Sequence, residues 1–154
     1  MINGVFSETL EMPVPYEPEY ESWCSVFGRF SVNAETDLIG HSAGAGFLLR
    51  WLSENKVKVG KLVLVAPFLD PEKTIKSGML DFEIDERLSE RSEEIVVFLS
   101  PDDDADILES VERIRLRLPS AKVIELPGRG HFTLGDMGTE EFPELRDVLL
   151  PERR

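Results

Sequence analysis

One short segment constrains the fold of this chain more than any other. Residues 37–46 read Asp-Leu-Ile-Gly-His-Ser-Ala-Gly-Ala-Gly, which is typical of a buried strand that runs through a Gly-x-Ser-x-Gly turn directly into a helix. We expect a side chain at Gly40 or Gly44 to collide with the neighbouring strand or helix, so that glycine is needed at both positions. The strained turn is expected to hold the Oγ atom of Ser42 exposed.

Apolar strand-like runs alternate with helical patterns along the rest of the chain, as in a mostly parallel sheet with helices on both faces. The expected strands are 4–12, 36–40, 61–66, 95–99 and 122–126, and the expected helices are 19–30, 43–55, 107–118 and 141–150. An irregular loop, 68–82, follows the carboxyl end of a strand, where such sheets bind ligands, and we expect it to form a substrate wall. The pattern predicts an α/β fold, a three-layer αβα sandwich with about five strands.

The composition is that of a folded protein and excludes several partners. Hydrophobic residues make up 42% and charged residues 31% of the 154 residues, which predicts one folded domain spanning residues 1–154. The net charge of −13 repels nucleic acid and anionic membrane surfaces, so we expect neither as a partner.

The cysteine content and the hydropathy predict the compartment. Cys24 is the only cysteine, which excludes an intrachain disulfide and a cysteine metal cluster and favours a reducing environment. No apolar run approaches the roughly 20 residues of a membrane span, and the N-terminus lacks the pattern of a signal peptide. We therefore predict a cytoplasmic protein.

A serine becomes an effective nucleophile when a neighbouring base takes its proton, and that base is usually a histidine oriented by a carboxylate. The chain has two histidines. His41 directly precedes Ser42, and adjacent side chains point in different directions, so His41 is poorly placed to deprotonate that serine. His131 follows the last predicted strand, at a carboxyl end where catalytic groups converge. We predict His131 as the base and the N–H group of Ala43 as a donor to a developing oxyanion.

The carboxylate that orients the histidine is expected in the loop after strand 95–99, because the chain order in this arrangement is serine, acid, histidine. Four aspartates crowd that loop, and spacing alone does not choose among Asp102, Asp103, Asp104 and Asp106. We favour Asp103, with Asp102 as the alternative. Asp104 or Asp106 can instead accept N–H bonds at the start of the following helix. The cluster also suits Ca²⁺ or Mg²⁺, but the EF-hand pattern is missing, and we predict no metal site.

Three short motifs carry a resemblance to a known family: Gly-His-Ser-Ala-Gly-Ala at 40–45, Ser-Pro-Asp-Asp at 100–103 and Gly-His-Phe at 130–132. With them, the chain resembles the small single-domain α/β hydrolases related to retinoblastoma-binding protein nine, over nearly its whole length. The resemblance implies an α/β-hydrolase-like fold and a cofactor-free serine hydrolase that cleaves ester or related acyl bonds. By the same resemblance, Ser42 matches the nucleophile of the family, Asp103 the second aspartate of its paired-aspartate motif, and His131 its base.

The chain departs from that family at its N-terminal end. Family members begin with a strand, a glycine-rich loop that supplies a second oxyanion N–H group, and a helix, all before the strand expected at 4–12. In the family sheet, the absent strand belongs between strands 4–12 and 36–40. We therefore expect another segment, or a second chain as in a homo-oligomer, to pair there, or the sequence to be a truncated relative. Asp104 also replaces a proline found after the aspartate pair in much of the family.

The residues and the resemblance together predict a serine hydrolase that acts on a small-molecule acyl substrate through an acyl-enzyme and needs no cofactor. The alternative is a catalytically impaired hydrolase-fold protein that acts as a protein-interaction domain, because a fold does not dictate a function. The second oxyanion donor bears on this choice, since the loss of one donor typically costs roughly 3–4 kcal/mol of transition-state stabilisation.

Overall fold

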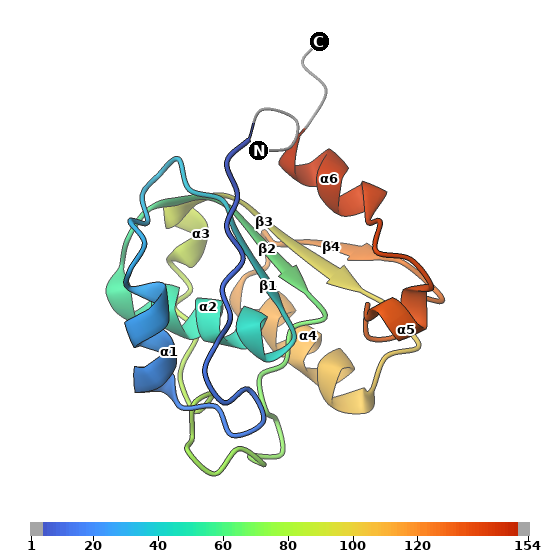
Figure 1. Cartoon of the computed structure of the whole chain (residues 1–154), viewed down its shortest axis with the longest axis horizontal. Coiled ribbons are helices and arrows are strands. Elements are labelled where there is room, and N and C mark those ends of the chain that lie inside the picture. The colour runs from blue at the N-terminus through green and yellow to red at the C-terminus, as the bar shows by residue number, and fades with distance from the viewer. Residues whose placement is uncertain (1–4, 151–154) are drawn as a thin grey trace.

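A parallel four-stranded sheet forms the centre of the molecule, in a computed structural model that describes residues 5–150 (Figure 1). Each strand pairs with the next strand along the chain, in the order β1-β2-β3-β4. The strands are β1 (Leu38–His41), β2 (Val59–Val65), β3 (Ser92–Leu99) and β4 (Lys122–Glu125). Because parallel strands need long crossover connections, helices lie between them in the sequence.

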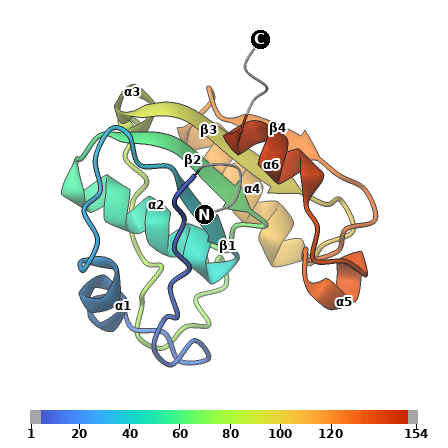
Figure 2. The same cartoon turned by 45° about the horizontal axis from the view of Figure 1, so that its top comes forward.

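Helices cover both faces of this sheet (Figure 2). The helices are α1 (Tyr20–Phe27), α2 (Ala43–Asn55), α3 (Leu88–Arg91), α4 (Ala105–Arg117), α5 (Leu134–Met137) and α6 (Pro143–Leu149). One apolar cluster joins residues of α1, α2 and α4 to one face of the sheet, and a second cluster joins α6 to the opposite face. This arrangement confirms the predicted α/β class and its three layers.

The two central strands carry apolar side chains on both faces, as expected for strands that are covered on both sides. In β2, Leu62 and Leu64 belong to the cluster under α2 and α4, whereas Val63 and Val65 belong to the cluster under α6. Strands near the edge of the sheet are less covered. Ile39 of β1 is in register with Val63, yet its side chain is 48% exposed. The face that carries α6 is therefore open beside β1.

Helix α2 has the bounds that its helical spacing predicts, Ala43–Asn55. Its buried face carries Phe47, whose ring lies 5.6 Å from the rings of Trp23 and Phe27 in α1. Gly46 lets the loop after β2 approach closely, because a Cβ atom there would lie 2.3 Å from the Phe68 carbonyl oxygen. The helix behind the elbow is thus held between α1 and this loop.

The loop after β2 is irregular, as expected for 68–82, and its own polar groups shape it. The Asp70 carboxylate accepts the N–H groups of Thr74 and Ile75. Desolvation raises the pKa of Asp70, but these hydrogen bonds outweigh it, and the pKa lies below its usual range. The Arg50 guanidinium of α2 donates to the Met79 carbonyl, 2.7 Å away. These contacts attach the loop to α2.

The first predicted strand, 4–12, is wrong in the described residues, and Gly4 lies outside them. Val5 is an isolated bridge residue, and residues 6–12 form no strand. Instead, the segment runs across α2 in both views (Figures 1 and 2), and Leu10 and Met12 pack against the cluster under α2. A strand requires a neighbour with matching backbone groups, and in residues 5–150 the sheet ends at β1. The described sheet therefore has four strands, fewer than the five expected.

The other differences concern the bounds of elements and two additional short helices. α1 ends at Phe27, three residues before the expected end, and β3 begins three residues before the expected start of strand 95–99. α6 begins at Pro143 because proline suits the first turn of a helix. The helices α3 and α5 were not predicted, since four residues are too few to show a helical period.

Candidate active site

Ser42 lies on the sharp turn between β1 and α2, in a backbone conformation that is rare for a residue with a side chain. Its φ is 55° and its ψ is −122°. Backbone hydrogen bonds hold this conformation: the Ser42 N–H group donates to the Val65 carbonyl at 3.0 Å, and its carbonyl accepts the Phe68 N–H group at 3.1 Å. Strain of this kind costs about 1–3 kcal/mol and persists where the surrounding structure imposes it.

The two glycines of the turn differ in their surroundings. A Cβ atom on Gly40 would lie 2.7 Å from the Cα and N atoms of Ala45, which confirms the expected collision. A Cβ atom on Gly44 would meet no described heavy atom within 4 Å, so the expected collision there is wrong. Gly44 lies in the first turn of α2, and that side of the turn is open. The tight packing of the elbow therefore depends on Gly40.

This difference predicts a contrast between two alanine variants. Gly40→Ala should lower the free energy of unfolding by about 1–3 kcal/mol, because the methyl group forces the strand and α2 apart. Gly44→Ala should leave it unchanged or raise it by up to about 1 kcal/mol, since alanine favours the helix over glycine. Urea unfolding of both variants, followed by circular dichroism, measures the contrast. Equal losses in the two variants would contradict it.

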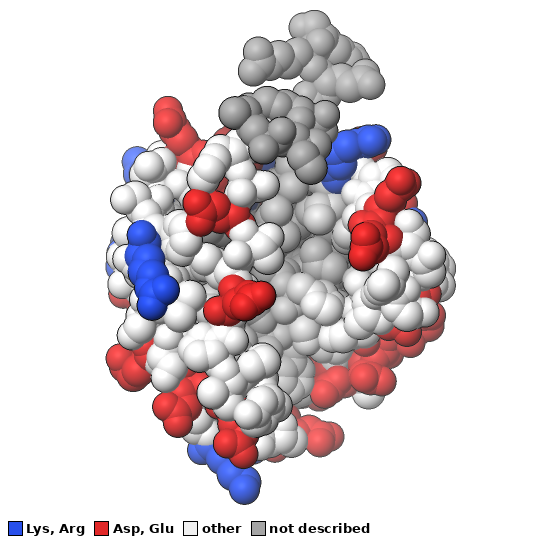
Figure 3. Space-filling model, in the orientation of Figure 1, with Lys and Arg blue, Asp and Glu red and all other residues white. Residues whose placement is uncertain are grey.

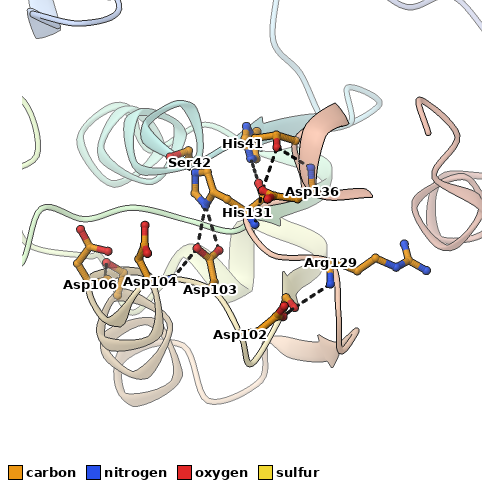
Figure 4. A network of polar contacts seen from close by, with 12 residues as sticks. His41, Ser42, Asp102, Asp103, Asp104, Asp106, Arg129, His131 and Asp136 are labelled. Carbon is orange, nitrogen blue, oxygen red and sulfur yellow. Dashed lines mark hydrogen bonds and ion pairs between the residues drawn. The ribbon is translucent and has the colours of Figure 1, made fainter. Parts of the chain in front are cut away.

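Three predicted side chains form one chain of contacts (Figure 4). The Nε2 atom of His131 lies 2.9 Å from Ser42 Oγ. On the other side of the ring, Nδ1 lies 3.0 Å from Asp103 Oδ2 and 3.1 Å from Asp103 Oδ1. The Asp103 side chain is 1% exposed and that of His131 is 29% exposed. The three residues follow β1, β3 and β4, so they meet at the carboxyl edge of the sheet.

The remaining aspartates of the loop point elsewhere (Figure 4). Asp102 accepts hydrogen bonds from the Ser100 hydroxyl and from the Gly128 N–H group, the latter at 3.2 Å. The Ser100 hydroxyl oxygen accepts the Arg129 N–H group at 3.1 Å. The bond from Ser100 is the main reason why the pKa of Asp102 lies below its usual range. Asp102 and Ser100 thus join the acid loop to the loop that carries His131.

The expected helix-capping role of the other aspartates is not observed. Asp104 is the N-cap residue of α4, but its side chain accepts no capping hydrogen bond. Instead, the Asp104 N–H group donates to Asp103 Oδ1 at 2.7 Å. Asp106 lies in the first turn of α4, where its charge is favourable next to the positive end of the helix dipole. Asp103 therefore contacts both the histidine and the start of α4.

The His41 ring forms no hydrogen bond with Ser42 Oγ, whose partner is His131. Its Nε2 atom lies 2.7 Å from the main-chain carbonyl oxygen of His131. Desolvation lowers the pKa of His41, although the bond to that carbonyl acts in the opposite direction. The ring of His41 therefore contacts the main chain of the loop that carries His131, which is called the base loop below.

Sequence reasoning missed Ser100 and Asp136, which support this site, and it named Asp102 only as the alternative acid. Ser100 and Asp102 join two loops, and Asp136 accepts the His131 N–H group at 2.9 Å. This bond is the main reason why the pKa of Asp136 lies below its usual range. No local pattern marks Ser100 or Asp102 in this role, because their partners lie on another segment. A polar residue next to a strand end is the one signal that Ser100 offers.

Ala43 is the first residue of α2, so its N–H group has no acceptor within the helix. Among residues 5–150, no other hydrogen bond engages this group. The position next to Ser42 leaves it available to an oxygen atom of a bound substrate.

One hollow near the surface does not include the elbow. It has a volume of about 270 Å³ and is lined by Arg129, Met137, Thr139, Glu141, Pro143 and Glu144. Figure 4 shows the Arg129 side chain pointing away from Ser42. Its guanidinium pairs with Glu144, and the two closest atoms are 2.6 Å apart. This hollow therefore does not supply the space next to Ser42.

Residues 5–150 contain no cluster of three or more His, Cys, Asp or Glu side chains placed to hold a metal ion. None of the described helices has both the length and the apolar character required to span a bilayer.

Known proteins share both the sequence pattern and this architecture. The profile of the family described as "Serine hydrolase" matches residues 6–150. The chain belongs to the serine hydrolase family. The match includes the elbow, the aspartate loop and the histidine loop of this serine hydrolase.

One relative is similar over almost the whole chain of this serine hydrolase. YdeN of Bacillus subtilis strain 168, described as a hydrolase, is 27% identical over 159 residues, which covers 97% of this chain and 81% of YdeN. The crystal structure of the ydeN gene product from B. subtilis has a TM-score of 0.79 at 25% identity, covering 91% of this chain and 78% of that chain. The similarity to YdeN is therefore found both in the sequence and in the fold.

A more distant structure shares only the fold with this serine hydrolase. The serine hydrolase CCSP0084 from the polyaromatic hydrocarbon-degrading bacterium Cycloclasticus zankles has a TM-score of 0.56 at 13% identity. The match covers 84% of this chain and 69% of that chain. These comparisons support a hydrolase with an α/β-hydrolase-like fold.

Proposed function

We propose that this serine hydrolase cleaves ester or related acyl bonds of small molecules, with Ser42 as nucleophile, His131 as base and Asp103 as the orienting acid. One observation carries the proposal: the continuous contact from Ser42 Oγ to the His131 ring and on to the Asp103 carboxylate, at 2.9 and 3.0 Å. These distances are within the reach that proton transfer requires. The resemblance to the hydrolases related to retinoblastoma-binding protein nine supports the same roles.

In the first half of the reaction, Ser42 Oγ attacks the acyl carbon and its proton passes to His131 Nε2. Asp103 accepts the Nδ1–H bond, so the neutral ring presents Nε2 as a free acceptor and the charged ring is stabilised. The N–H group of Ala43 donates to the oxyanion that forms on the acyl oxygen. When the tetrahedral intermediate collapses, the leaving group takes the proton from His131. Ser42 then carries the acyl group as an ester.

The second half repeats these steps with water. His131 Nε2 takes a proton from water, whose oxygen attacks the acyl carbon of the Ser42 ester. Collapse of the second intermediate breaks the bond to Ser42 Oγ, which regains its proton from His131. The products are a carboxylic acid and the free enzyme. No step calls for a cofactor.

The surface charge supports a restriction on the substrate. Figure 3 shows acidic side chains outnumbering basic ones on both sides of a hollowed middle, and the chain has a net charge of −13. Such a field repels polyanions. A neutral or cationic acyl substrate therefore suits this surface better than a nucleic acid or a polyphosphate.

The proposal is tested with a fluorophosphonate probe, which modifies activated serines, and with a p-nitrophenyl ester of a short acid. The purified chain should hydrolyse the ester, and mass spectrometry should place the probe on the peptide that contains Ser42. Heat-denatured protein serves as the control, because an unactivated serine should not react. Failure of the folded chain both to react with the probe and to hydrolyse the ester would contradict the enzymatic role. That outcome would favour the alternative of a protein-interaction domain.

A further inference from the structure

Each of the four polar groups of His131 has its own partner. Its ring contacts Ser42 and Asp103. Its main-chain N–H group donates to Asp136 Oδ2 at 2.9 Å, and its main-chain carbonyl lies 2.7 Å from His41 Nε2. The two main-chain contacts act on the position of the residue as a whole. They therefore set where the ring lies relative to Ser42.

The loop around His131 needs such contacts because its backbone is strained. The residues on either side of His131 both have positive φ values, 54° for Gly130 and 57° for Phe132. A residue other than glycine in this region costs on the order of 1–3 kcal/mol and keeps that conformation only when its surroundings impose it. Asp136 lies in α5, only five residues after His131, so its bond is local and does not connect the loop to the sheet. His41 belongs to the sheet.

His41 is well placed for that task. It is in register with Val65 of β2, a residue of the cluster that also contains Phe132. The side chain of His41 thus extends toward the base loop, and its ring centre lies 4.8 Å from that of His131. Because a carbonyl oxygen only accepts hydrogen bonds, His41 Nε2 must be the donor. His41, which is next to Ser42 in the chain, thereby holds the main chain of His131 in place.

We propose that His41 is a positioning residue, which fixes the distance between the nucleophile and the base by donating a hydrogen bond from the elbow strand to the main-chain carbonyl of His131. The inference rests on the proposed function of Ser42 and His131. His41 takes no proton from Ser42 in this role. It contributes one hydrogen-bond donor, at about the distance from the main chain at which an imidazole ring places its Nε2 atom.

This role is tested with three variants of the full chain that differ in reach. Glutamine can place its Nε2 donor close to the position of the imidazole Nε2, asparagine is one methylene shorter, and alanine has no donor. His41→Ala and His41→Asn should lower the kcat for p-nitrophenyl ester hydrolysis by about ten- to a hundredfold. His41→Gln should recover most of the loss. KM should change little in all three, because His41 is not proposed to contact the substrate.

Labelling rates with the fluorophosphonate probe should fall and recover in the same order. Thermal unfolding midpoints separate this effect from general instability, and where the alanine variant fails to fold, the glutamine and asparagine pair decides. The role of His41 would be overturned by a folded alanine variant with an unchanged kcat, or by glutamine performing no better than asparagine. Ser42→Ala is measured in parallel: if it retains hydrolysis, the proposed function itself fails, whereas its inactivity with unaffected His41 variants rejects only the positioning role.

Discussion

Replacing Ser42 with alanine should lower the kcat for hydrolysis of a p-nitrophenyl ester by on the order of 10⁵- to 10⁶-fold. The variant has no oxygen atom that can form the acyl-enzyme, so only the contacts that polarise the substrate are left to act on an attacking water molecule. Reaction with the fluorophosphonate probe should disappear as well. Initial rates and intact-protein mass spectrometry measure the two effects.

The matched control for this variant is Ser25→Ala. Ser25 is an exposed serine of α1 whose hydroxyl donates to the Glu21 carbonyl within the same helix, so its loss should leave kcat unchanged. The change at Ser42 removes one oxygen from a half-buried position of the elbow, and we expect the unfolding midpoint to stay close to that of the parent chain. Hydrolysis that survives in Ser42→Ala would exclude Ser42 as the nucleophile.

Replacing Asp103 with asparagine should lower kcat by about 10⁴-fold. The carboxylate accepts a hydrogen bond from His131 Nδ1 at 3.0 Å, which leaves Nε2 free to take the proton of Ser42. An asparagine amide can instead donate to Nδ1 and so place the ring proton on Nε2, toward Ser42. The wrong tautomer cannot act as a base. Steady-state kinetics of the folded variant measure this loss.

Asp102→Asn is the matched control, because it makes the same chemical change one residue earlier. Asp102 contacts Ser100 and Gly128, and an asparagine oxygen can still accept both hydrogen bonds. We expect its kcat to fall less than about tenfold. This loss is far smaller than the loss expected when His131 has the wrong tautomer. A larger loss in Asp102→Asn than in Asp103→Asn would reverse the assignment of the acid.

The sequence predicts the elbow well because the signals there are local. The bounds of α2 follow from helical spacing directly after Ser42, and the collision at Gly40 follows from a sharp turn between a strand and a helix. The place of each of the three site residues is also predicted from local signals, since each residue lies just after a strand. Buried strands such as β2 are recognised from their continuous apolar runs.

Other predictions failed where the answer depends on a distant partner. The apolar pattern of residues 4–12 suits a strand, but a strand forms only beside a neighbouring strand. In the described sheet, β1 is an edge strand with no further strand beside it. Leu10 and Met12 bury their side chains against the helices instead. Gly44 has the expected residue type without the expected collision, because no described atom lies close to it. Short helices such as α3 and α5 carry too few residues to show a period.

By itself, the sequence determined the scaffold of this serine hydrolase and the position of Ser42, because a strand, a strained turn and a helix follow from neighbouring residues. Only the tertiary structure decided which of the paired aspartates faces His131 and what the second histidine contacts. Asp103 meets the ring of His131, Asp102 ties two loops together, and His41 contacts a carbonyl 90 residues away in the chain. These choices depend on which segments the sheet brings to its carboxyl edge, and no spacing within one segment records them.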